Sequence, residues 1–199
     1  TDIERSSLKN NNNIAEVLSV KNTTNSLFSQ YYYIEVGSLH NKLIPIAMEY
    51  LQYLGTDKYS ADDISKKFYT LACDFGVNAG NDESYVYLNG LQENFDEADV
   101  LFEHLLNNCK ANETALKDMI AGMKKKRADQ KLNKNYISSG LIAYAKYGEK
   151  NPFNNELSNN ELDQINANTL IDILHSITKY KHKVLYYGPL SASDFVSKK

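Results

Sequence analysis

The feature of the sequence that most constrains the fold is the grouping of its expected strands and helices. Two β-rich stretches, residues 14–20 and 27–36, come first, and apolar residues at helical spacing then predict helices over 44–54 and from Ser60 to Gly76. The rest of the pattern predicts extended segments over 77–91, helices over 94–109, 113–127, 138–147 and 168–177, and a strand over 183–187. Because strands do not alternate singly with helices, the order favours an α+β fold in which a mostly antiparallel sheet packs against several helices.

The composition indicates a sizeable core and argues against two classes of partner. Of the 199 residues, 42% are hydrophobic and 11% are aromatic, which is enough for a globular domain. The net charge of -3 offers no basic field for a nucleic-acid backbone, and no apolar run approaches the ~20 residues that span a bilayer. We therefore expect a soluble fragment with no nucleic-acid partner and no membrane span, and its compartment stays unknown.

The two ends of the sequence predict a fragment of a longer protein. The chain begins without Met in a polar stretch, and residues 191–199, SASDFVSKK, are typical of a helix that begins after a serine cap. We expect residues 1–24 to hold an N-terminal segment and the first strand, residues 25–190 to form the α+β domain, and residues 191–199 to begin a following segment. Any targeting signal of the parent protein would then lie upstream.

One predicted helix carries an acid among apolar neighbours. In IPIAMEYLQYLGT, residues 44–56, the apolar side chains recur at helical spacing, so one broad face should be buried, and Gly55 ends the helix. Glu49 lies between Ile46 and Tyr50. If those two residues were histidines, the segment would read H-x-x-E-H, the motif of inverted zinc peptidases.

Three stretches, taken in their order and spacing, resemble the pitrilysin and insulinase family of zinc metallopeptidases. They are LFSQYYYIEVGSLHNKLIPIAMEYLQYLGT (27–56), FGVNAGNDESYVYLNGL (75–91) and KVLYYGPLSASDF (183–195). The resemblance covers nearly the whole chain from about residue 25. It implies an α+β domain like those of the mitochondrial processing peptidase.

The resemblance also implies where a zinc site would lie, and that this chain lacks it. In the family, two histidines bind zinc, the Glu between them is the general base, and a Glu on a later helix is the third ligand. Here Ile46 and Tyr50 stand at the histidine positions, Glu49 alone matches, and Ile120, which follows Glu113 at the family's spacing, stands at the third position. The resemblance thus implies no catalytic residue and no metal or other cofactor in this domain.

The function implied by the resemblance is that of a catalytically inactive peptidase-like domain, the first domain of the C-terminal half of a zinc metalloendopeptidase. It would complete the substrate chamber, contact peptide substrate, and support a catalytic half that carries the zinc in the same polypeptide or in a partner peptidase subunit. The alternative is a stand-alone pseudopeptidase subunit that acts in assembly or protein binding. An intact H-x-x-E-H upstream in the parent sequence would favour the first hypothesis.

The residues themselves also offer no constellation for hydrolysis. A zinc site typically needs two histidines at i and i+4 on one helix face, together with a third ligand. No such pair occurs, and G-x-S-x-G, P-loop and C-x-x-C motifs are absent. A hydrolase built on Glu103 and His104 is the remaining enzymatic alternative, and it lacks convergent ligands. The four histidines are His40, His104, His175 and His182.

Four further residues or runs have structural interpretations. Cys73 and Cys109 fall in apolar helical surroundings, which predicts inert buried thiols, with a disulfide as the alternative. The basic run at residues 124–127 is expected on a solvated helix face. Glu49 should pair with a Tyr, Lys or Arg if it faces the core, or lie half exposed, because an unpaired buried carboxylate is costly.

Overall fold

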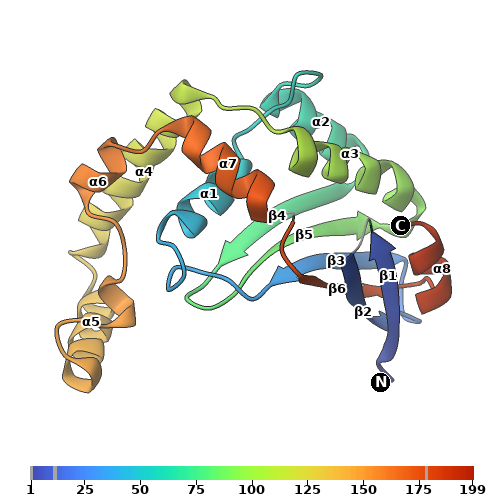
Figure 1. Cartoon of the computed structure of the whole chain (residues 1–199), viewed down its shortest axis with the longest axis horizontal. Coiled ribbons are helices and arrows are strands. Elements are labelled where there is room, and N and C mark those ends of the chain that lie inside the picture. Colours follow the sequence, from blue (N-terminus) through green and yellow to red (C-terminus); the bar gives the residue numbers. More distant parts are fainter. Residues whose placement is uncertain (1, 11–12, 178) are drawn as a thin grey trace.

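Six strands form one sheet in the computed structural model, which describes residues 2–10, 13–177 and 179–199 (Figure 1). Their spatial order is β1-β2-β6-β3-β5-β4, and every neighbouring pair is antiparallel except β2 and β6, which are parallel. The predicted mixed fold with a mostly antiparallel sheet is therefore confirmed, with one parallel pair. The strands span Glu4–Asn10 (β1), Asn13–Lys21 (β2), Leu27–Ile34 (β3), Cys73–Ala79 (β4), Ser84–Leu91 (β5) and His182–Gly188 (β6).

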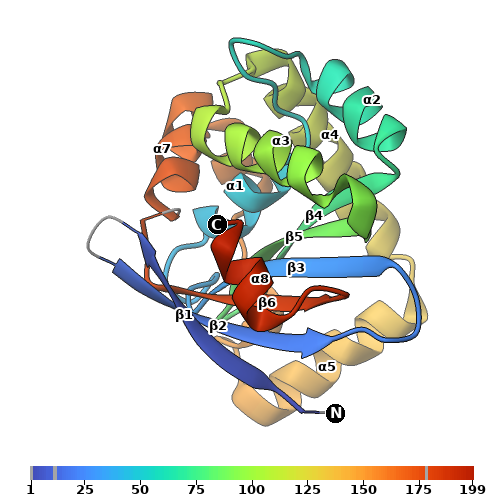
Figure 2. The same cartoon turned by 90° about the vertical axis from the view of Figure 1, so that its right-hand side faces the viewer.

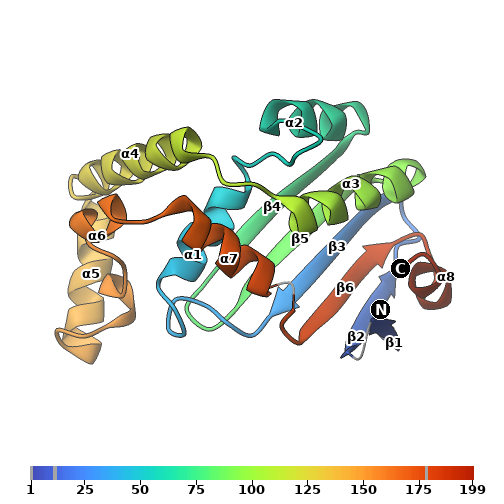
Figure 3. The same cartoon turned by 45° about the horizontal axis from the view of Figure 1, so that its top comes forward.

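Helices cover one face of this sheet (Figures 2 and 3). α1 contacts β4 and α7, α3 contacts β5 and α7, and α8 contacts β1 and β2. Within the described residues, no helix is both long and apolar enough to cross a membrane. The helices span Leu43–Leu51 (α1), Ala61–Thr70 (α2), Phe95–Asn108 (α3), Glu113–Gln130 (α4), Lys134–Tyr147 (α5), Asn159–Asp163 (α6), Ala167–Ile177 (α7) and Ala192–Ser197 (α8), with short 3-10 turns at Gln92–Asn94 and Pro152–Asn154.

Alternation along β3 separates the two faces of the sheet. Phe28 and Ile34 are buried under the helices, whereas Tyr31 and Tyr33 point to the other face and are only partly covered. The strands paired with β3 keep this parity, so Leu88 and Val184 join the buried face. The hydrophobic core therefore lies between the sheet and the helices, and the opposite face of the sheet carries partly exposed tyrosines.

Serine caps fix the starts of two helices where the sequence predicted them. The Ser60 hydroxyl accepts a hydrogen bond from the Asp63 N–H, and the Asp63 carboxylate accepts one from the Ser60 N–H, which forms a capping box. The Ser191 hydroxyl accepts from the Asp194 N–H at the start of α8. The helix expected after residue 191 is confirmed.

α4 and α5 follow one another along the chain and extend away from the sheet (Figure 1). The expected basic surface is confirmed at Lys125 and Lys126, which are exposed, while Lys124 and Arg127 form ion pairs with residues of the 156–163 region. α5 has no buried residue, and it carries several exposed apolar side chains: Ile137, Leu141, Ile142, Tyr144 and Tyr147.

The structure corrects the predicted helix over 60–76 and the setting of Cys73. α2 ends at Thr70, Ala72 adopts a positive φ of 49°, and β4 begins at Cys73 because this segment pairs with β5. Cys73 is therefore a strand residue, and Cys109 directly follows α3. Both thiols are free and buried, so the disulfide alternative is wrong. Strand β1 was not predicted, since its sequence ERSSLKN is polar.

We expect opposite effects from alanine at two glycines. A Cβ at Gly90 would lie 2.8 Å from both the Ala72 carbonyl oxygen and the Cys73 Cα, whereas one at Gly122 in α4 meets nothing within 4 Å. Gly90→Ala should lower the free energy of unfolding by about 1–3 kcal/mol through overpacking. Gly122→Ala should raise it by roughly 0.5–1 kcal/mol through helix propensity. Urea unfolding monitored by circular dichroism measures both, and equal effects would contradict the register of β4 and β5.

Candidate functional site

The three positions that correspond to zinc ligands in the resembling family are core positions in this chain. Ile46 and Tyr50 lie one turn apart on α1 and are 8% and 0% exposed, and Ile120 on α4 is 7% exposed. α1 and α4 contact one another, and all three side chains belong to one hydrophobic core. Burial of this kind gives these residues a packing role.

Tyr50 adds a polar anchor to that packing. Its hydroxyl donates to the Asn112 carbonyl oxygen and accepts from the Asn112 N–H, both at 2.7 Å. Asn112 also caps α4, since its side chain accepts from the Ala115 N–H. Burial raises the pKa of the Tyr50 phenol, although the hydrogen bond with the Asn112 backbone acts in the opposite direction. The phenol thus stays protonated and ties the middle of α1 to the start of α4.

Zinc does not fit these positions. Ile46 and Ile120 carry no donor atom, and the Tyr50 hydroxyl is already engaged by backbone groups. Across residues 2–10, 13–177 and 179–199, no three side chains of His, Cys, Asp or Glu gather closely enough to hold a metal ion.

Glu49 lies on the side of α1 that faces a surface hollow. Its side chain is half buried, and it has no hydrogen bond or ion pair with any described residue. The hollow has a volume of about 680 Å³ and lies between α1 and the helices α4 and α5. Of the two settings considered from sequence, the half-exposed one is found, and a pairing with Tyr, Lys or Arg is not seen among the described residues.

The four histidines are dispersed and separately engaged. His40 accepts from the Gly37 N–H, His104 bonds to the Thr56 hydroxyl at 3.0 Å, and His182 lies 3.0 Å from the Tyr180 carbonyl oxygen. Glu103 turns away from His104 and accepts a hydrogen bond from Tyr32. The Glu103–His104 pair therefore forms no joint acid–base or metal-binding arrangement.

Cys109 and His175 form a contact that was not predicted from the sequence. The Cys109 Sγ lies 3.6 Å from the His175 Nε2, and the two residues are 66 positions apart. Burial raises the pKa of the Cys109 thiol to about 11, so the thiolate needed for nucleophilic attack is scarce at neutral pH. The pair is a partly buried contact between α7 and the end of α3.

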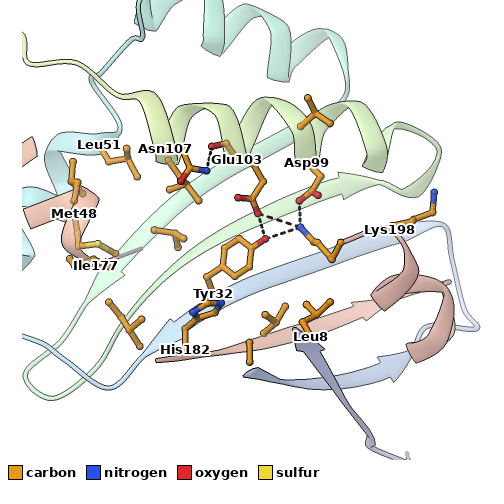
Figure 4. Close-up of a pocket in the computed structure, with 18 residues that line it drawn as sticks. Leu8, Tyr32, Met48, Leu51, Asp99, Glu103, Asn107, Ile177, His182 and Lys198 are labelled. Carbon is orange, nitrogen blue, oxygen red and sulfur yellow. Dashed lines mark hydrogen bonds and ion pairs between the residues drawn. The ribbon is translucent and has the colours of Figure 1, made fainter. Parts of the chain in front are cut away.

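A second cavity, of about 510 Å³, lies between α3, α7 and the sheet (Figure 4). Apolar side chains line most of it, and a polar cluster lies at one end. Lys199 Nζ contacts the Asp99 carboxylate, lies 2.7 Å from the Tyr32 hydroxyl and 3.6 Å from the Glu103 carboxylate, and Gln30 donates to Asp99 at 2.9 Å. This cluster fixes the end of the chain to α3 and β3.

Electrostatics keep Tyr32 protonated in this cluster. Burial, followed by the nearby Glu103 and Asp99 charges, raises the pKa of the Tyr32 phenol well above its usual range. The sequence signals for the cluster were a Gln on the buried face of β3 and an Asp on the buried face of α3, at Gln30 and Asp99. From the sequence alone, neither residue was predicted to have a role.

We predict that Tyr50→Phe destabilises the chain. The change removes the only side-chain oxygen that bonds Asn112 N–H and C=O among the described residues, and a hydrogen bond contributes about 0.5–1.5 kcal/mol net to stability. Tyr53→Phe is the matched control, because Tyr53 is 45% exposed. Denaturant unfolding should show the loss in the first variant and a change within about 0.5 kcal/mol in the second. Equal stabilities would contradict the anchoring role of Tyr50.

Solved structures that share this fold include peptidases and a peptidase domain. No protein-family model and no curated protein sequence matches the chain. An M16 peptidase inactive domain from Pseudomonas fluorescens aligns at a TM-score of 0.83 and 20% identity, over 100% of this chain and 49% of that one. The periplasmic protease PqqL from Escherichia coli aligns at 0.76 and 12% identity, over 98% and 23%. The ferredoxin protease FusC, solved with Arabidopsis ferredoxin, aligns at 0.74 and 12% identity, over 100% and 24%.

The chain spans about half the length of the first of these structures and about a quarter of the other two. At these identities the likeness concerns the fold. The predicted resemblance to a pitrilysin-family inactive domain is confirmed at that level, and the chain has the fold of an M16 peptidase domain.

Proposed function

We propose that the chain is a catalytically inactive peptidase-like domain. In this proposal it completes a substrate chamber and supports a catalytic half that carries the zinc ion and the general base in the same polypeptide or in a partner subunit. The domain would resemble those of the mitochondrial processing peptidase and would stand first in the C-terminal half of its parent protein.

The proposal rests on one observation: the positions that would hold zinc ligands are occupied by residues of the hydrophobic core. Ile46, Tyr50 and Ile120 are buried, and Tyr50 is hydrogen-bonded to Asn112. A histidine or carboxylate at these positions would place a polar group in the core, where it needs partners. The helix that would present zinc ligands in an active domain therefore serves packing in this one.

The lengths of the structural neighbours support a division of labour. The chain matches about one half of one neighbour and about one quarter of two others, which suits a unit that works beside further domains. One neighbour is itself described as an inactive domain. Another was solved with a protein bound to it, which makes contact with a polypeptide a reasonable role to propose for this chain.

The uncovered face of the sheet supports contact with peptide. Tyr31, Tyr85 and Tyr87 form a partly exposed aromatic cluster there, with Tyr31 lying 5.6 Å from Tyr85 and 5.9 Å from Tyr87 between ring centroids. Tyrosine is enriched in binding surfaces because one end of the ring is apolar and the other is polar. β4 lies at the edge of the sheet, and an edge strand offers backbone groups with which an extended peptide pairs.

The α5 helix supports contact with another domain. Ile137, Leu141 and Tyr144 follow one helix face at i, i+4 and i+7 and are 46%, 66% and 61% exposed. A helix with an uncovered apolar stripe is unusual in a monomer. Such a stripe suits the surface by which an inactive domain would support a catalytic half.

We predict that the chain neither binds zinc stoichiometrically nor cleaves peptides. Equilibrium dialysis against Zn²⁺ measures the first property, and incubation with unfolded casein in the presence of Zn²⁺ measures the second. Glu49→Gln is the matched variant, because it removes the motif's remaining acid without changing its size. One zinc per chain that is lost in this variant, or chelator-sensitive cleavage of casein, would contradict the proposal.

A further inference from the structure

The hollow between α1 and the helices α4 and α5 combines an apolar floor with charged walls. Ile46 and Met119 are buried at its base, and Pro45, Met123 and Leu157 are half-buried around it. Its volume of about 680 Å³ is in the range of sites that hold a small molecule or a few side chains of a peptide. The floor suits the aliphatic part of a bound side chain.

Most of the cations at this hollow already have an acidic neighbour. The Arg127 guanidinium donates to the Glu156 carboxylate at 2.9 Å and to the Asn159 side chain at 3.0 Å. Lys42 acts electrostatically on Glu161 of α6. Lys126 is exposed, so its ammonium group can remain hydrated.

Two acids at the hollow have no such neighbour. Glu49 and Asp118 make no ion pair with any of the described residues. Asp118 is exposed, whereas Glu49 is half buried beside Ile46. A half-buried carboxylate is less screened by water than an exposed one, so Glu49 gains more from a cationic partner.

We propose that this hollow binds a lysine or arginine side chain of an extended peptide, with its aliphatic stem on the Ile46, Met119 and Met123 floor and its charged end at the Glu49 carboxylate. This inference rests on the proposed function, since it names the class of peptide that the inactive domain would contact. Long cationic side chains match such a site because they bury their stem and keep the charge at a polar group. An acidic side chain would meet Glu49 with like charge.

The experiment measures binding of capped, fluorescently labelled peptides of Ala, Gln and Thr that differ in one central residue: lysine, norleucine or glutamate. Fluorescence anisotropy with the full chain at low salt gives the affinities. We expect the lysine peptide to bind about tenfold more tightly than the norleucine peptide, as one charge-assisted hydrogen bond predicts. Added salt should weaken the binding of the lysine peptide more than the binding of the norleucine peptide.

Two substitutions locate the preference. Glu49→Gln should remove the tenfold advantage of lysine and leave norleucine binding unchanged, and Glu49→Lys should transfer the preference to the glutamate peptide. Glu93→Gln is the matched control, because Glu93 is exposed and lies outside the hollow. Asp118→Asn should have less effect than Glu49→Gln. Unfolding curves of each variant verify that it is folded.

The outcomes separate this inference from the function on which it rests. Equal binding of lysine and norleucine peptides, or a preference that survives Glu49→Gln, would overturn the cation site and leave peptide contact intact. A preference lost in Asp118→Asn and kept in Glu49→Gln would also overturn it. No binding of any peptide would overturn the site and remove the peptide-contact part of the proposed function, whereas the zinc and casein results would stand unaffected.

Discussion

The hydrogen bonds between the Tyr50 hydroxyl and both backbone groups of Asn112 hold together the parts on which the rest of the structure depends. On one side of this connection, α1 contacts β4 and α7, so it belongs to the layer that covers the sheet. On the other side, Asn112 caps α4, the first of the two helices that extend away from the sheet. The interaction joins α1 to α4, and these two helices both line the hollow.

Helix geometry explains why the two faces of α1 have separate roles. Residues at i and i+4 lie on one side of a helix, so Ile46 and Tyr50 are buried together, and Glu49 lies about 60° around the helix from Ile46. Histidines at this spacing could bind one zinc ion, with an acid beside them. In this chain the same spacing gives two core residues, Ile46 and Tyr50, and one acid at the surface, Glu49. Glu49 therefore lies at the surface of the helix, beside the hollow.

Much of the fold was predictable because its signals are local. α3 follows a 3.6-residue apolar period, β3 shows alternation, and the serines at residues 60 and 191 cap helices by hydrogen bonds within three residues. The failures had non-local causes. β1 is polar and is ordered by its pairing with β2, and Cys73 belongs to a strand because it pairs with Gly90 across the sheet.

At the candidate site, the sequence predicted only that non-ligand residues stand at the zinc-ligand positions of the resembling family. Ile46, Tyr50 and Ile120 could be recognised in the sequence because a motif fixes their positions, and their burial follows from apolar spacing. The hollow, the contact between Cys109 and His175, and the cluster of Tyr32, Asp99 and Lys199 bring together residues that lie far apart in the chain. No local sequence pattern predicts contacts between residues so far apart. A polar residue on a buried face, Gln30, was a signal of the cluster around Asp99.

α1 is part of the cooperative core of this fold. Native-state hydrogen exchange of the amides of Ala47, Tyr50 and Leu51 tests it most directly, because the opening free energy of each amide reports whether it exchanges by local or by global unfolding. The account predicts opening free energies equal to the global free energy of unfolding measured with denaturant. Markedly lower values, with α1 opening while the sheet remains protected, would contradict it.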